Sequence, residues 1–112
     1  MSWSLKRAKE QGPTVEDLRR ARGYQSIEAL VPRARVAVIG QVEHVSTVDY
    51  DGVASFEISL EDETGSLVAL WTGRPNIQCI DRGRRLALFG RVAPMRREES
   101  LVLYNPRYEL LP

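Results

Sequence analysis

The sequence is short of residues that several classes of protein require. It has one cysteine and one histidine among 112 residues. These two residues, Cys79 and His44, cannot build a disulfide framework or a zinc site within one chain. We therefore interpret Cys79 as a small, semi-buried apolar residue and His44 as a polar residue at the end of a strand. No metal or other cofactor is expected.

Long apolar runs are also missing. No segment approaches the roughly 18 to 20 consecutive apolar residues of a membrane span. The start, MSWSLKRAKEQG, lacks the apolar stretch of a secretory signal. We therefore expect a cytoplasmic protein that has no membrane partner. A chain of 112 residues with 43% hydrophobic content suffices for one compact domain with one core.

Patterns that carry catalysis are scarce as well. Carboxylates are abundant, but no pair is set against a His, Cys or Lys in a recognisable arrangement. No Gly-rich phosphate loop leads from a strand into a helix. We expect no catalytic residues and no enzymatic activity.

The net charge of +1 says little about partners, but the charge is unevenly distributed. Residues 1–35 hold eight Lys and Arg against four acids, and residues 64–112 hold eight Arg against four acids. Between them, residues 36–63 hold seven acids and no base. Of the 16 bases 14 are Arg, which fits either bidentate phosphate contacts or a source genome rich in G and C.

Residues 1–32 differ from the rest and are predicted to form a short N-terminal helical arm. The stretches WSLKRAKEQ and TVEDLRRARG carry good helix formers. Thr14 and Asp17 are spaced as a capping box, and Gly23 is placed as a stop. Apolar positions are few, so we expect one or two short, partly mobile helices.

From residue 33 the apolar period changes to two, which predicts β-strands. Turn signals at Asp51-Gly52, Thr64-Gly65, Arg82-Gly83 and the charged run 96–99 separate them. Only residues 73–83 interrupt the strands, with room for about one helical turn. This layout predicts an all-β, five-stranded OB-fold barrel over residues 33–112. The predicted strands are 34–46, 53–62, 66–72, 84–94 and 100–105.

Two heptapeptides resemble each other, VAVIGQV at 36–42 and LALFGRV at 86–92. In a small barrel the first strand bends to serve both halves of the sheet, and the fourth coils around the closing edge. Each strand therefore needs a residue without a side chain. Gly40 and Gly90 meet this need. Nothing else repeats around them, so we predict a shared geometric demand and no internal duplication.

The segment LEDETGSLVALW, residues 60–71, resembles the Asp-x-Thr-Gly turn of OB domains in replication protein A subunits, the RecG helicase wedge and class II aminoacyl-tRNA synthetases. Asp62 can cap this turn, and Gly65 can take the left-handed conformation. SIEALVPRARVAVIGQV precedes it, and WTGR, IDRGRRLALFGRV and YNPRYELL follow. Residues 26–111 are thereby similar to short stand-alone actinobacterial OB-fold nucleic acid binding proteins. The resemblance implies the OB fold and a nucleic-acid-binding role.

OB domains usually bind single strands across the outer face of strands two and three, using aromatic stacking and basic residues. Alternation predicts that the inward residues are Phe56, Ile58, Leu60 and Trp71, and that the outward ones are Ser55, Glu57, Ser59 and Glu61. In the synthetases, the position matching Glu57 tends to carry a stacking aromatic, which this chain lacks. The loop STVDYDG offers Tyr50 as a stacking platform between two acids.

The basic residues that are candidates for contacting nucleic acid come from the second half of the chain. Five arginines lie near the third strand's exit, on the fourth strand, in the loop after it and near the chain's end, where they can converge on one rim. Such a rim would attract a phosphate backbone without reading sequence. The alternative is solvated surface Arg, with Arg96 and Arg97 paired to Glu98 and Glu99. The candidate nucleic-acid-binding residues are Tyr50, Arg74, Arg91, Arg96, Arg97 and Arg107.

Val68 and Leu70 are predicted on the outer face, beside two carboxylates. This apolar pair favours an alternative in which a protein partner, a second copy or the chain's own arm covers the face. The arm offers Trp3 and Leu5 and is basic. The main prediction is a weak, sequence-tolerant binder of single-stranded DNA or RNA. The alternative is a protein interaction or oligomerisation module built on the same barrel.

Overall fold

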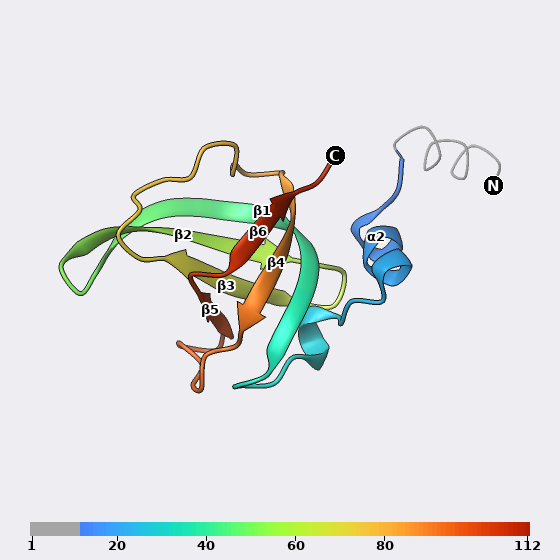
Figure 1. Ribbon diagram of the computed structural model, residues 1–112, viewed down its shortest axis with the longest axis horizontal. Coiled ribbons are helices and arrows are strands. Elements are labelled where there is room, and N and C mark those ends of the chain that lie inside the picture. Colours follow the sequence, from blue (N-terminus) through green and yellow to red (C-terminus); the bar gives the residue numbers. More distant parts are fainter. Residues whose placement is uncertain (1–11) are drawn as a thin grey trace.

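The computed structural model describes residues 12–112, so the predicted first helix, with Trp3 and Leu5, lies outside the described residues. The described part begins with a helix and a 3-10 turn and continues as strands (Figure 1). The elements are α2 (Val15–Arg22), η1 (Ile27–Ala29), β1 (Arg35–Tyr50), β2 (Val53–Glu61), β3 (Ser66–Trp71), β4 (Arg85–Arg91), β5 (Val102–Tyr104) and β6 (Arg107–Leu110).

The strands form one sheet in the order β5-β3-β2-β1-β4-β6. The first half of β1 pairs with β4 and the second half with β2, while β3 and β5 pair in parallel. A bridge between Val92 and Leu103 joins the chain after β4 to β5, which closes the sheet into a barrel. This is the OB arrangement, and it confirms the predicted all-β fold.

The last predicted strand, 100–105, continues further than expected after a kink. β5 pairs with β3, and beyond Asn105 and Pro106 the chain resumes as β6, which pairs antiparallel with β4. Asn105 has a φ of 52°, in the left-handed region that Asn tolerates, and Pro106 has no N–H to donate to a ladder. The kink lets one stretch of chain serve two edges of the barrel.

The first strand is longer than the predicted 34–46, because it runs on to Tyr50. It forms a long hairpin with β2 through Asp51 and Gly52, whose φ values of 52° and 79° suit a two-residue turn. His44 accordingly lies within β1, so its interpretation as a strand-end residue is wrong. A register shift just before His44 interrupts the alternation, which hides the strand's continuation in the sequence.

Gly40 and Gly90 do not share one geometric role. Gly40 lies where β1 passes from β4 to β2, and a Cβ there would stand 2.7 Å from the Glu61 carbonyl oxygen and 2.7 Å from Leu60 Cγ. A Cβ on Gly90 would lie 3.5 Å from the Pro106 Cβ, an ordinary contact. The predicted need for glycine is confirmed at Gly40. It is wrong at Gly90, because no backbone approaches β4 closely there.

The barrel core follows the predicted alternation. Its main buried cluster includes the predicted inward residues Phe56, Ile58, Leu60 and Trp71. Ile27 and Leu30, from the stretch predicted as an arm, belong to the same cluster. Asp62 connects this stretch to the β2–β3 turn, because its carboxylate accepts the N–H of Ile27 at 2.8 Å and that of Thr64 at 2.7 Å. The end of the arm is thus packed into the barrel.

Helix α2 begins and ends as predicted. The Asp17 N–H donates to Thr14 Oγ1 and the Thr14 N–H donates to the Asp17 carboxylate, both at 3.0 Å. Gly23 ends the helix in the left-handed conformation, with a φ of 69°. These caps satisfy backbone groups that a short helix would otherwise leave without partners.

Helix α2 covers the outer face of β1 and β4, not that of β2 and β3. A small buried cluster forms on that face, where Val15, Leu18, Tyr24 and Phe89 pack against Ile39, Ala87 and Leu111. An ion pair between Arg22 and Glu109 ties the helix end to β6. The hypothesis that the arm covers Val68 and Leu70 is therefore wrong for residues 12–32.

Residues 73–83 interrupt the strands as predicted, and they form turns with no helix. Cys79 is exposed there with a φ of 72°, so its interpretation as semi-buried is wrong. Ile77 and Ile80 anchor the loop in the core instead, and the residues between them point into solvent.

Candidate nucleic-acid interface

Two tyrosines lie together on the outer face of the barrel, beside the β1–β2 hairpin. Tyr50 is the last residue of β1 and Tyr104 the last of β5, and their ring centroids are 5.8 Å apart with an angle of 45° between the planes. Tyr104 keeps 39% of its surface exposed. The neighbouring Tyr104 hydroxyl, followed by partial desolvation, raises the pKa of Tyr50 above its ordinary value. Tyr50 therefore presents a neutral phenol at physiological pH.

Strand register explains how Tyr104 reaches this face. Tyr104 pairs with Leu70 of β3, and Leu70 pairs with Glu57 of β2. Residues that are paired across neighbouring strands carry their side chains on the same side of a sheet. Tyr104 and Glu57 are therefore outward neighbours across three strands.

Arg97 reaches the same face from the loop between β4 and β5 (residues 92–101). Its guanidinium donates to the Glu57 carboxylate, and this bond raises the pKa of Arg97. The two side chains retain 38% and 23% of their exposure, so the pair remains open to water and to ligands. It lies close enough to Tyr50 for the Arg97 charge to act on the tyrosine's pKa.

The alternative pairing of Arg96 and Arg97 with Glu98 and Glu99 is not formed among the described residues. Arg97 and Ser100 exchange two backbone hydrogen bonds of 3.0 Å, which make a tight turn. Glu98 lies in this turn with a φ of 57°. The turn leaves the Arg97 side chain directed at β2, and Arg96 bonds only the Glu99 carbonyl oxygen, at 3.3 Å.

The apolar pair predicted on this face does not form an exposed patch. Leu70 is fully buried and Val68 is half-buried. Val102, which pairs with Val68 on the outward side of β5, is also buried. Arg97, from the loop after β4, contacts Glu57, which pairs with Leu70 on this part of the sheet. The protein-partner alternative therefore loses the observation that favoured it.

The opposite end of the same face is acidic. Desolvation, followed by the nearby Glu43 carboxylate, raises the pKa of Glu61 above its ordinary value. Asp62 adjoins them at the end of the hairpin. These negatively charged carboxylates would repel a phosphate backbone. The candidate interface is therefore the end that holds Tyr50, Tyr104 and Arg97. We call these three residues, with Glu57, the tyrosine face.

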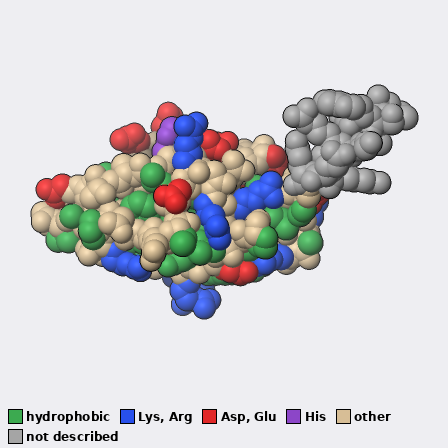
Figure 2. All heavy atoms as spheres, turned by 90° about the horizontal axis from the view of Figure 1, so that it is seen from above, with side chains coloured by type: hydrophobic (Ala, Val, Ile, Leu, Met, Phe, Trp, Pro, Cys, Tyr) green, Lys and Arg blue, Asp and Glu red, His purple; other side chains and the backbone are tan. Residues whose placement is uncertain are grey.

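The other predicted arginines lie elsewhere. Arg91 donates to the Arg33 carbonyl oxygen at 2.7 Å, beyond the end of the tyrosine face. Arg74 and Arg107 line a separate cavity. The structure therefore brings Tyr50 together with Arg97 and the loop of Arg96, and it does not bring all five arginines to one rim. On the face shown in Figure 2, basic side chains are scattered among acidic and apolar ones.

Sequence reasoning missed Tyr104, although a signal for it existed. Leu101 and Leu103 are buried in the core, so alternation along this strand directs Tyr104 outward. The strand pairs with β3 next to β2, so an outward aromatic there belongs to the binding face of an OB barrel.

No three His, Cys, Asp or Glu side chains are grouped in residues 12–112 so that they could hold a metal ion. In the same part of the chain, neither helix has the length and apolar character needed to cross a membrane.

No protein-family model matches the chain, and no curated protein matches it in sequence. Solved structures do match its fold. RecG bound to a three-way DNA junction aligns with a TM-score of 0.64 and 18% identity over 79% of this chain and 12% of RecG. The p204 HINb domain aligns with a TM-score of 0.64 and 17% identity over 83% of this chain and 49% of that chain.

A third similar structure is the Ifi202 HINa domain in complex with a 20bp dsDNA. It aligns with a TM-score of 0.62 and 15% identity over 85% of this chain and 50% of that chain. The chain thus spans half or less of the length of these structures. At such identities the likenesses show a shared fold, and for RecG they agree with the resemblance seen in the sequence.

Proposed function

We propose that this protein is a non-enzymatic binder of single-stranded nucleic acid, which holds the strand on the tyrosine face. The observation that carries the proposal is the placement of Tyr50 and Tyr104 beside Arg97, on the outer side of β2, β3 and β5. OB barrels use this side for single strands, with aromatic rings for bases and cations for phosphates.

Each group has a distinct role in this proposal. The tyrosine rings stack with successive bases, which every base permits because each has a π-face. Arg97 contacts the backbone, where the Glu57 carboxylate now occupies the position of a phosphate oxygen. Arg96, which is exposed on the same loop, adds a second contact. Binding is therefore expected to tolerate many sequences.

Two considerations support nucleic acid as the ligand class and a single strand as its form. Two of the structures that share the fold are described bound to DNA, a three-way junction for RecG and a duplex for the Ifi202 HINa domain. A half-exposed pair of rings can stack only with bases that are free of their partners. We assign binding and no catalysis, because the face combines phenols with a paired Arg and Glu and has no nucleophile beside a base.

The test is an anisotropy titration with a labelled thymidine oligomer and with a duplex of the same length, across a series of salt concentrations. A plot of the logarithm of single-strand affinity against the logarithm of salt concentration should have a negative slope of about 0.7 per phosphate contacted. Changing Arg96 and Arg97 together to Ala should flatten this slope by about 1.4, which corresponds to two phosphate contacts. Tyr104→Ala should cost about 1 to 3 kcal/mol of binding with little change in slope, because stacking releases no counterions.

Arg20→Ala is the matched control, since Arg20 is an exposed arginine of α2 far from the tyrosine face. It should leave both affinity and slope unchanged. Stronger binding of the duplex would contradict the single-strand assignment. An absence of binding to either ligand at low salt would contradict the proposal as a whole.

A further inference from the structure

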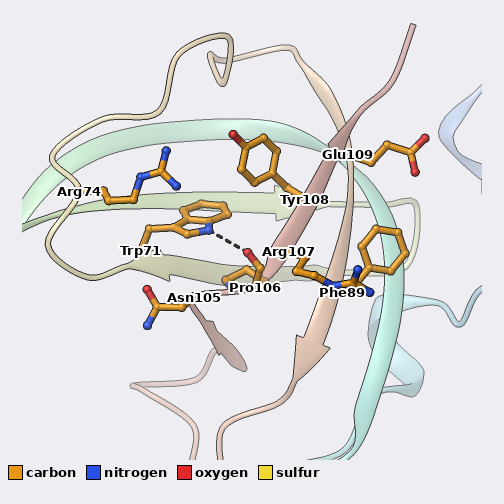
Figure 3. Close-up of a pocket in the computed structure, with 8 residues that line it drawn as sticks. All are labelled: Trp71, Arg74, Phe89, Asn105, Pro106, Arg107, Tyr108 and Glu109. Carbon is orange, nitrogen blue, oxygen red and sulfur yellow. Dashed lines mark hydrogen bonds between the residues drawn. The ribbon is translucent and has the colours of Figure 1, made fainter.

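A cavity of about 670 Å³ opens beside the kink that follows β5. Its walls include Trp71, Arg74, Phe89, Asn105, Arg107 and Tyr108 (Figure 3). A second hollow of about 290 Å³ shares Phe89 and Arg107 with it and extends to Arg35. Because they share walls, we treat the two as one surface and call it the Arg107 groove.

The Arg107 groove carries excess positive charge. Arg35, Arg74 and Arg107 form no salt bridge with any residue of the part described, 12–112. The one acid on its wall, Glu109, is bonded to Arg22 through both oxygens, at 3.1 and 3.2 Å. This bond lowers the pKa of Glu109 and neutralises its charge locally. An anion entering the groove therefore meets arginines without competing carboxylates.

Arg107 is held ready for such an anion. Its guanidinium carbon lies 5.4 Å from the centre of the Phe89 ring, a cation–π arrangement that fixes the guanidinium over the ring. The edge of the guanidinium, which carries its N–H donors, remains available for phosphate oxygens. In the view of Figure 3, the Trp71 indole lies between Arg74, from the loop after β3, and Arg107, from β6.

Two polar groups of the groove floor, the Trp71 indole N–H and the Asn105 side-chain oxygen, are already used by the protein. The Trp71 indole N–H donates to the Pro106 carbonyl oxygen at 2.9 Å. The Asn105 side-chain oxygen accepts the backbone N–H of Thr72 at 3.0 Å. These groups are therefore not free to read the edge of a base. The groove offers charge and apolar surface, which suits a phosphate backbone better than a specific nucleoside.

The groove and the tyrosine face meet at the kink. Tyr104 belongs to the tyrosine face, and the next residue, Asn105, lines the groove. We propose that a strand bound on the tyrosine face continues around this kink into the Arg107 groove, where Arg74 and Arg107 contact its phosphates. The proposal rests on the proposed function and extends it to a second, sequence-independent segment of the same ligand.

The experiment compares thymidine oligomers of about 4 and about 12 nucleotides, both within the range of about 4 to 16 that OB domains hold. The longer oligomer should bind more tightly and show a steeper salt dependence. Changing Arg74 and Arg107 together to Ala should remove this gain, flatten the slope of the longer oligomer by about 1.4, and leave the shorter one unaffected. Arg82→Ala, an exposed arginine of the loop before β4, is the matched control.

A second variant guards against a purely structural effect. Arg107→Lys keeps the charge and loses the planar group over Phe89, so it should largely retain the slope of the longer oligomer. If the longer oligomer gains nothing, the groove proposal is overturned while the tyrosine face stands. Equal weakening of both lengths by the Arg74 and Arg107 changes, or displacement of the longer oligomer by thymidine monophosphate alone, would also overturn it. Failure of both lengths to bind overturns both proposals.

Discussion

Helix α2 and the loop between β4 and β5 each lie over an outer face of one barrel, but different forces hold them there. Under α2, Leu18 and Tyr24 pack on the buried residues Ile39 and Ala87, so contact depends on apolar burial. The ends of the loop are buried in the core at Val92 and Leu101, but its tip reaches the face through a partly exposed ion pair between Arg97 and Glu57. Exposed pairs contribute only about 0 to 1 kcal/mol, so a charged ligand can replace one partner at little cost.

The comparison indicates which face the barrel leaves for a ligand. On the α2 face the apolar residues of the sheet are buried against the helix. Two ion pairs, from Arg19 to Glu63 and from Arg22 to Glu109, also hold the helix in place. The tyrosine face keeps its rings partly exposed and its arginine at the surface. A ligand reaches the second face without unfolding any element.

The largest effect is expected where β1 passes from one face to the other. Gly40→Ala would place a Cβ 2.7 Å from the Glu61 carbonyl oxygen, so the ladder between β1 and β2 has to move. We expect a loss of about 3 kcal/mol in the free energy of unfolding, at the upper end of the usual cost of overpacking. Urea denaturation curves of the variant and the wild type measure it.

Gly90→Ala is the matched control, because its Cβ would meet Pro106 at an ordinary 3.5 Å. Its free energy of unfolding should stay within about 1 kcal/mol of the wild type. Equal losses for the two variants would show that the two similar heptapeptides do meet one geometric demand after all.

This pair of glycines shows how far the sequence predicts the fold. Alternation and the Asp51-Gly52 turn suffice for the barrel, because both are local patterns. The different roles of Gly40 and Gly90 depend on which strand passes nearby, which no local pattern contains. The continuation of the last strand beyond Pro106 was missed for a related reason, since proline normally ends a strand and only the pairing with β4 restores it.

The candidate site was predictable in part. Tyr50 and Arg97 could be named because they lie at or near the two connections, after the first strand and after the fourth, that flank the binding side of an OB barrel. The partner of Arg97 could not, because Glu57 lies 40 residues away and the contact depends on how the loop turns at Glu98. The prediction put Arg74 and Arg107 on one rim with the other three arginines, whereas they line a cavity that does not include Arg97.

The second prediction tests the apolar contact under α2. Leu18→Ala removes part of a half-buried side chain from the cluster with Ile39, so it should lower the free energy of unfolding by about 1 to 2 kcal/mol. The loss should persist at high salt, because burial is not screened. Arg20→Ala, on the solvent side of the helix, should change stability by less than about 0.5 kcal/mol. A salt-dependent loss for Leu18→Ala would contradict apolar packing as the main force.

The third prediction tests the ion pair on the tyrosine face. Glu57→Gln removes the carboxylate that competes with phosphate, and it should change the free energy of unfolding by less than about 1 kcal/mol. Affinity for a thymidine oligomer should rise about 2- to 10-fold, since 1.4 kcal/mol corresponds to a factor of ten. Glu61→Gln, at the acidic end of the face, is the control for net charge. If both variants raise affinity equally, Glu57 does not compete at the site itself.

The smallest effect concerns acid. Hydrogen bonds from the Thr14 backbone and side chain lower the pKa of Asp17, and Arg22 lowers that of Glu109. Both carboxylates are more acidic in the folded state, so the unfolded state binds more protons around the ordinary values of about 4. The stability that the two carboxylates contribute is complete above about pH 4, their ordinary pKa. It is lost as the pH falls below that value and through their lower pKa in the folded state. Hydrogen-exchange protection factors of α2 amides should therefore decline between pH 6 and pH 3, relative to amides of β2.

In a variant with Asp17→Asn and Glu109→Gln, protection of α2 should already be low at pH 6 and should change little with pH. A parallel decline in α2 and β2 would show that acid weakens the barrel as a whole and does not act through these two contacts.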